Sequence, residues 1–134
     1  MRQAIVVILM AAFFILIGAK CTPPEEPKQI DFEANGFQVM NTTAYCCGTV
    51  TANGSKVHEG GCASSIERIG MVAIIYTLDG EFLGYFEVND TGKQGGGVRN
   101  GTVADIYRSD YDRAVEWMET TDGKCWIKFV DGHG

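Results

Sequence analysis

The sequence is poor in basic residues, histidine and proline. Of its 134 residues only 11 are Lys or Arg, against 17 Asp or Glu, so the formal net charge is −6. Phosphate binding needs clustered positive charge, and the few basic residues here are scattered, so the composition argues against nucleic acid or an anionic membrane surface as a partner. The chain also lacks a Cys-x2-Cys spacing, which is typical of structural zinc sites.

No apolar run reaches the length of about 20 residues that a bilayer-spanning helix needs. The longest run covers residues 4–19 and follows a short basic start at residues 1–3. This pattern predicts an export signal over residues 1–20, either cleaved or retained as an N-terminal membrane anchor. Lys20 disfavours a lipoprotein site at Cys21, because a lipobox needs a small residue there. We expect a protein that is secreted, periplasmic or anchored on the outer face of the cytoplasmic membrane.

The three prolines all lie within residues 23–27, among charged residues. Such a composition cannot form a packed core and favours an extended backbone. We interpret residues 21–36 as a Pro-rich linker and residues 37–134 as one folded domain. A domain of roughly 100 residues can bury a single core, and covalent cross-links would add to its stability.

The rest of the chain has the pattern of short strands separated by turns. Alternating or β-branched apolar runs predict strands at residues 37–45, 71–78, 82–88, 103–107 and 125–130. Asp79-Gly80 predicts a hairpin with a type I′ turn. Ser109 is expected to cap a helix over residues 110–119. The predicted fold is mainly β, a small barrel of five or six strands with one or two short helices.

Asp90 and Asp105 lie at the two ends of a short connection within this β-rich region. Two carboxyl groups allow a protein without metal or cofactor to cleave a glycosidic or peptide bond, because one is held protonated while the other adjusts its pKa. The pair is therefore our candidate active site, and the chemistry expected of it requires no cofactor and no metal.

Several short motifs occur in an order that resembles the 3D domain, a family named after three aspartates. They are TTAYC at residues 42–46, TANG at 51–54, IG at 69–70, NDTG at 89–92, a glycine at 101 and ADIY at 104–107. The family includes the catalytic part of the MltA-type lytic transglycosylases, and the Sps and resuscitation-type muralytic proteins. The resemblance covers residues 37–130 and implies a six-stranded double-psi β-barrel.

The resemblance also implies a lytic transglycosylase that acts on peptidoglycan glycan strands. Such an enzyme cleaves the bond between N-acetylmuramic acid and N-acetylglucosamine and leaves a 1,6-anhydro sugar. By its motif, Asp105 has the acid/base role of the family's catalytic aspartate, and Asp90 has the supporting role. The substrate-binding residues that the motifs imply are Thr43, Tyr45, Thr91, Gly92 and Tyr107.

Two alternatives follow from the sequence. The first of the family's three aspartates would fall near residues 63–65, which are Ala-Ser-Ser, so the main alternative is a non-catalytic glycan-binding module. Asp-Thr-Gly at residues 90–92 is also the signature of aspartic proteases, and a chain this short would need to dimerise to bring two such aspartates together.

The spacing of the two aspartates also differs from the family pattern. Asp105 follows Asp90 by 15 positions, a longer spacing than the family suggests, and we interpret residues 93–97 as the insertion.

Apart from the cysteine in the linker, the chain has Cys46, Cys47, Cys62 and Cys125. In an exported domain this number predicts two disulfides. Adjacent cysteines point to opposite faces of a strand and would form a strained ring with each other. Cys46 and Cys47 are therefore each expected to pair with Cys62 or Cys125. A zinc site that adds His58 is the alternative.

Overall fold

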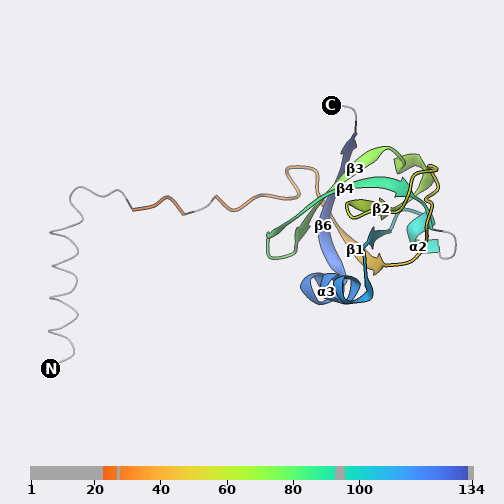
Figure 1. Ribbon diagram of the computed structural model, residues 1–134. Coiled ribbons are helices and arrows are strands. Elements are labelled where there is room, and N and C mark those ends of the chain that lie inside the picture. The colour runs from red at the N-terminus through yellow and green to blue at the C-terminus, as the bar shows by residue number, and fades with distance from the viewer. Residues whose placement is uncertain (1–22, 27, 93–95, 133–134) are drawn as a thin grey trace, which may run out of the picture.

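The structure, a computed structural model, describes residues 23–26, 28–92 and 96–132. Six strands close into a barrel in the order β1-β5-β2-β4-β3-β6 (Figure 1). In chain order the elements are β1 Gln38–Tyr45, β2 Gly61–Ala63, the 3-10 helix η1 Ile66–Arg68, β3 Met71–Thr77, β4 Phe82–Asp90, α2 Gly96–Arg99, β5 Val103–Tyr107, α3 Tyr111–Thr121 and β6 Lys124–Asp131. The predicted fold, a small six-stranded β-barrel with short helices, is confirmed.

The barrel mixes parallel and antiparallel neighbours. β1 pairs in parallel with β5, and β2 in parallel with β4, while an antiparallel contact between β2 and β5 joins the two pairs. β3 and β6 complete the barrel through antiparallel contacts. Parallel neighbours cannot be joined by a tight hairpin, so the central strands pair with segments distant in sequence. This pairing places β4 and β5 on either side of β2.

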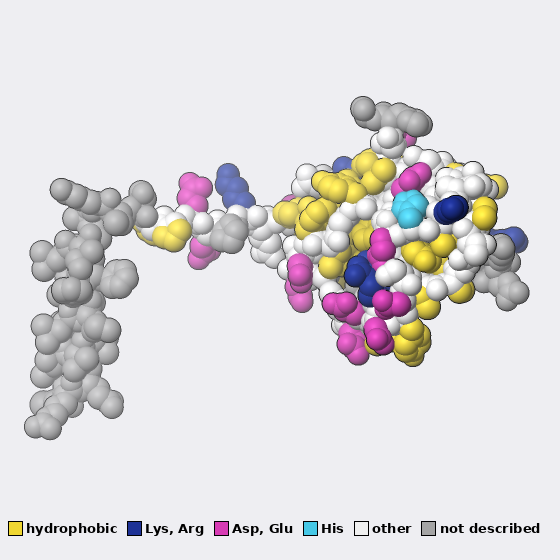
Figure 2. Space-filling view, viewed as in Figure 1, with side chains coloured by type: hydrophobic (Ala, Val, Ile, Leu, Met, Phe, Trp, Pro, Cys, Tyr) yellow, Lys and Arg dark blue, Asp and Glu magenta, His cyan; other side chains and the backbone are white. Residues whose placement is uncertain are grey.

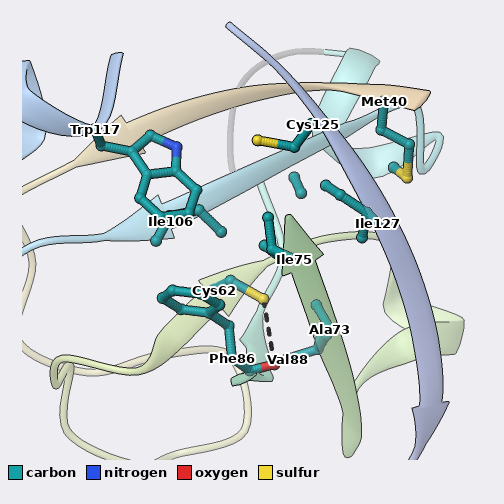
Figure 3. Close-up of a cluster of buried hydrophobic side chains, with 11 residues drawn as sticks. Met40, Cys62, Ala73, Ile75, Phe86, Val88, Ile106, Trp117, Cys125 and Ile127 are labelled. Carbon is teal, nitrogen blue, oxygen red and sulfur yellow. Dashed lines mark hydrogen bonds between the residues drawn. The ribbon is translucent and has the colours of Figure 1, made fainter. Parts of the chain in front are cut away.

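Alternate residues of the strands point into the barrel and form its core. The buried cluster, drawn in Figure 3, consists of Met40, Cys62, Ala73, Ile75, Phe86, Val88, Ala104, Ile106, Trp117, Cys125 and Ile127. Burying a large apolar side chain completely stabilises the fold by about 1.5–3 kcal/mol. On β5 the buried residues are Ala104 and Ile106, so the side chain of Asp105 between them points away from the core.

Helix α3 covers one end of the barrel (Figure 1) and inserts Trp117 into the core (Figure 3). The indole Nε1 of Trp117 donates to Thr42 Oγ1 at 3.0 Å, and that hydroxyl donates to the Ala104 carbonyl oxygen at 3.0 Å. The indole is also edge-on to the ring of Phe86, with centroids 5.4 Å apart. Trp117 thereby links α3 to β1 and β4, and through the Thr42 hydroxyl to β5.

The helix is confirmed, but its predicted N-cap is wrong. Asp110 is the N-cap, and its Oδ1 accepts the backbone N–H of Arg113 at 2.9 Å. Ser109 instead donates its backbone N–H to Glu59 Oε1 at 2.6 Å. Burial by itself would raise the pKa of Glu59. This hydrogen bond and the guanidinium groups of Arg108 and Arg113 outweigh that effect and hold the pKa below its usual value. Glu59 therefore fastens the loop before β2 to the start of α3.

β3 and β4 form the predicted hairpin, but its turn is not type I′. Thr77 N donates to Glu81 O at 2.8 Å, and Gly80 N donates to Thr77 O at 3.0 Å. Gly80 has a φ of 93°, whereas Asp79 is not among the residues with positive φ. A type I′ turn requires positive φ at both central residues. The connection is instead a three-residue loop that ends on a left-handed glycine.

The last residues of the predicted linker pack on the barrel. Phe32 is only 9% exposed, and its ring stacks on Trp126 with centroids 5.2 Å apart. Phe37 and Tyr76 also contact the ring of Phe32, both edge-on. The packed part of the chain therefore begins several residues before residue 37. The predicted export signal at residues 1–20 lies outside the described residues, and within those described no helix is both long and apolar enough to span a membrane.

The predicted pairing of Cys46 and Cys47 with Cys62 or Cys125 is wrong, since these four are free cysteines in the described part of the chain. Cys62 on β2 and Cys125 on β6 belong to the barrel core, whereas Cys46 and Cys47 follow the end of β1 and are partly or fully exposed. The inward direction of the two core cysteines separates them from the other pair. Burial raises the pKa of Cys125 to about 12, and burial with the charges of Asp105 and Glu87 does the same for Cys62.

We expect only Cys46 and Cys47 of these four to react with a thiol reagent in the folded protein. Cys62 and Cys125 lack both solvent access and thiolate character, on which cysteine reactivity depends. Alkylation under native conditions and in denaturant, followed by residue-resolved mass spectrometry without reduction, measures this. Recovery of any of the four only after reduction would contradict the free-thiol arrangement.

Candidate active site

Asp90 and Asp105 are aligned with the same residue of β2. Ala63 is the register partner of Asp105 on one side and of Asp90 on the other. Because neighbouring strands are about 4.8 Å apart, the two aspartate Cα atoms are separated by about 10 Å, with the small side chain of Ala63 between them. The structure thus brings together the two carboxyl groups that the sequence singled out.

Asp105 has the surroundings of a general acid. It points outward from β5, is partly buried, and accepts a hydrogen bond from Thr43 Oγ1 at 2.8 Å. Burial raises the pKa of Asp105, and the negative charge of Asp90 adds to the rise, while the hydrogen bond from Thr43 opposes it. A carboxyl group whose pKa is raised in this way remains protonated closer to neutral pH than a solvated one.

Asp90 holds the loop beside the site. Its Oδ1 accepts the backbone N–H of Ala52 at 3.0 Å and that of Thr91 at 2.8 Å. The backbone N–H of Asn53 also donates to the Asn89 carbonyl at 3.1 Å. These bonds fix the TANG turn against the end of β4. Asp90 therefore contributes both a negative charge near Asp105 and the position of the neighbouring loop.

Tyr45, one of the residues that the motifs place in the site, has a hydroxyl group without a hydrogen-bond partner among the described residues. Tyr45 and Tyr107 are register partners at the ends of β1 and β5, and their rings meet edge-on at 5.4 Å. The oxygen of this hydroxyl group is buried. Burial raises the pKa of Tyr45, with further contributions from Asp90 and Asp105. A buried hydroxyl without a partner is an exception in proteins, and this one lies near the two carboxyl groups of the candidate site.

Thr91 and Gly92 lie directly after Asp90, and the contacts described for them hold the local backbone in place. Thr91 bonds to the Asp90 side chain through its backbone. The carbonyl oxygen of Gly92 accepts Arg99 Nε at 2.7 Å, and a Cβ on Gly92 would come within 2.8 Å of Val98 Cβ. Glycine at this position therefore allows the chain to pack closely against α2. Most of the predicted insertion, residues 93–95, lies outside the described residues.

The position expected for the family's first aspartate contains a serine and a guanidinium group. Ser64 is fully buried, and its Oγ accepts Arg68 Nη1 at 3.2 Å. The same Arg68 nitrogen donates to the Gly101 carbonyl oxygen at 2.8 Å, and the guanidinium lies 4.0 Å over the ring of Phe129. Sequence reasoning missed Arg68, since a single arginine in a short 3-10 helix has no distinguishing local pattern.

The zinc alternative does not match the arrangement of its proposed ligands. His58 has Nδ1 2.8 Å from the Glu59 carbonyl oxygen and Nε2 3.9 Å from Glu87 Oε2. Cys62 and Cys125 belong to the barrel core instead. Within residues 23–26, 28–92 and 96–132, no group of three or more His, Cys, Asp or Glu residues is placed to hold a metal ion.

No protein-family model matches the chain, and no curated protein matches its sequence significantly. The resemblance to the 3D domain therefore rests on the short motifs themselves. The geometry of Asp105, Asp90 and Tyr45 is the structural support for the function that those motifs imply.

Proposed function

We propose that the protein is a peptidoglycan lytic transglycosylase with Asp105 as its acid and base. It would cleave the bond between N-acetylmuramic acid and N-acetylglucosamine and release 1,6-anhydro-N-acetylmuramic acid. The observation that supports this most is the environment of Asp105, a partly buried carboxyl group with a raised pKa beside a second carboxylate. The predicted export of the chain agrees with a substrate outside the cytoplasm.

The reaction needs a single proton-transferring group. Asp105 in its protonated form gives its proton to the glycosidic oxygen as the bond from that oxygen to the anomeric carbon breaks. The C6 hydroxyl of the same muramic acid residue then attacks the anomeric carbon, and its proton passes to the Asp105 carboxylate. The 1,6-anhydro bond forms, the acid is regenerated, and no water is consumed.

The neighbours of Asp105 have matching roles in this proposal. The charge of Asp90 helps to keep Asp105 protonated before the first step and stabilises the positive charge that develops on the sugar ring. The buried hydroxyl of Tyr45 has no acceptor among the described residues, so a rotation of this side chain on binding would let it donate to a polar group of the sugar. The paired rings of Tyr45 and Tyr107 offer apolar edges to the sugar face.

A non-catalytic glycan-binding module is the second candidate. It is favoured by Ser64, which stands where the family has its first aspartate and bonds to Arg68. Incubation of purified peptidoglycan with the protein, followed by mass spectrometry of the soluble fraction, separates the two candidates. Muropeptides ending in 1,6-anhydro-N-acetylmuramic acid support the enzyme. Sedimentation of the protein with the glycan without any released product supports the binding module.

The pH profile of kcat/KM is expected to shift in opposite directions in two variants. A general acid works protonated, so activity should fall as the pH rises through the pKa of Asp105. Thr43→Val removes a hydrogen bond that lowers this pKa, so the alkaline limb should move to higher pH. Asp90→Asn keeps an Oδ1 acceptor for the loop but removes the charge that raises the pKa, so the limb should move to lower pH. Profiles of both variants that coincide with wild type would contradict the assignment of Asp105.

A further inference from the structure

A surface hollow of about 720 Å³ lies between the end of β1 and helix α3. Its walls include Tyr45 from β1 and Tyr111, Val115 and Met118 from α3. Tyr111 is 72% exposed and Met118 37% exposed, which leaves apolar surface open to solvent along the helix. The hollow is shallow and open to solvent, and it is large enough for a small organic ligand or a short peptide to lie along it.

One edge of the hollow is acidic. Glu119 and Asp122 line it at the C-terminal end of α3, and neither forms an ion pair with any described residue. Acidic side chains gather over α3 on the face shown in Figure 2. The hollow therefore offers apolar walls together with two uncompensated carboxylates, an arrangement that favours a ligand with small apolar groups and a positive charge.

The hollow also adjoins the candidate active site. Tyr45 lines the hollow, and it lies two positions along β1 from Thr43, whose hydroxyl bonds to Asp105, so the side chains of Tyr45 and Thr43 share one face of the strand. A ligand attached covalently to a sugar at Asp105 would therefore extend into the hollow along Tyr45.

We propose that this hollow binds the peptide stem of peptidoglycan, a short peptide that carries alanine methyl groups and, in uncross-linked form, a free primary amine. This inference rests on the proposed function, since the stem is attached to the muramic acid whose glycosidic bond Asp105 would cleave. The methyl groups contact Tyr111, Val115 and Met118. The ammonium group lies at the edge formed by Glu119 and Asp122.

The test is a titration of the full-length protein with a soluble stem pentapeptide that has a free lysine amine, measured by calorimetry. The double variant Glu119→Gln/Asp122→Asn should bind it about three- to tenfold more weakly, the sum expected for two exposed ion pairs. Asn is well tolerated in the left-handed conformation of Asp122 (φ 51°), so this change preserves the end of the helix. Acetylating the lysine amine should weaken binding to wild type by a similar factor and leave binding to the double variant unchanged.

Two further variants complete the test. Val115→Arg fills the hollow with a cation and should abolish binding. Glu116 is an exposed carboxylate of α3 that does not line the hollow. The Glu116→Gln variant should therefore bind the pentapeptide as tightly as wild type. Absence of binding to wild type, or equal binding by Val115→Arg, overturns the inference. So does self-association of the chain that Val115→Arg abolishes, which would make a second copy the occupant.

Failure of this inference and failure of the proposed function give different results. If wild type releases anhydro-sugars equally from intact peptidoglycan and from glycan strands stripped of stems, and does not bind the pentapeptide, only the stem site is wrong. If the pentapeptide binds in the hollow but no anhydro-sugar is released from either substrate, the transglycosylase assignment is wrong. The assignment of the hollow as a site for the peptide stem then still holds.

Discussion

Replacing Asp105 by Asn is expected to lower the rate of anhydro-sugar release from peptidoglycan by about 10²–10⁴-fold, the usual contribution of a positioned general acid or base. In the wild-type protein Thr43 Oγ1 donates a hydrogen bond to Asp105 Oδ1 at 2.8 Å. Asn has nearly the same shape as Asp, and its side-chain oxygen can still accept this bond. It cannot transfer a proton to the glycosidic oxygen. The rate is measured by quantitative mass spectrometry of anhydro-muropeptides over time.

The matched control is Asp110→Asn, the same chemical change at the N-cap of α3. Asn caps a helix about as well as Asp, and Asp110 lies outside the candidate site, so stability and activity should both remain close to wild type. Asp105→Asn should also unfold at the same denaturant concentration as wild type or a higher one, because it removes a carboxylate that burial disfavours. Undiminished product release by Asp105→Asn would exclude Asp105 as the catalytic acid.

The second large effect concerns stability. Trp117→Ala is expected to lower the free energy of unfolding by about 3–5 kcal/mol, the usual cost of truncating a buried Trp. Trp117 is 5% exposed, contacts the ring of Phe86 and donates a hydrogen bond to Thr42 Oγ1. Truncation leaves a cavity at the end of the barrel and removes the hydrogen bond from α3 to Thr42 of β1. Urea unfolding of both proteins, followed by circular dichroism, measures the difference.

Two variants separate the packing of Trp117 from its hydrogen bond. Thr42→Val keeps the shape of the side chain but leaves the indole N–H and the Ala104 carbonyl without the bonds that Thr42 now makes, which should cost about 1–3 kcal/mol. Met118→Ala changes the partly exposed neighbour on the same helix, and we expect a smaller loss. A loss below about 1 kcal/mol for Trp117→Ala would mean that the core closes without this side chain, since buried truncations of this size normally cost more.

Much of the fold could be predicted where a local pattern exists. The β-branched apolar run at residues 71–78 became β3 Met71–Thr77, and the short run at residues 103–107 became β5 Val103–Tyr107. The helix predicted at residues 110–119 is α3. These elements were accessible because alternation with a period of two, or recurrence every three to four residues, is visible within a few positions of the chain.

The cysteines show where composition misled the prediction. Four cysteines in a chain with a predicted export signal suggested two disulfides, yet Cys62 and Cys125 are core residues and all four are free cysteines in the described part of the chain. Whether a strand cysteine points into a barrel or toward a partner depends on the register of that strand, and a change of one position reverses its direction. Cysteine count alone carries no information about that register.

The sequence by itself determined the strand-rich fold class, the positions of most strands and the choice of Asp90 and Asp105 as the chemically interesting pair. Only the tertiary structure decided how that pair is arranged. β2 has just three residues, too few for a recognisable period, yet Ala63 in it aligns both aspartates. The unpartnered hydroxyl of Tyr45 and the contacts of Arg68 likewise depend on segments far apart in the chain. Local patterns indicate which segments form strands and helices, whereas the neighbours and the register of each strand are set by closing the barrel as a whole.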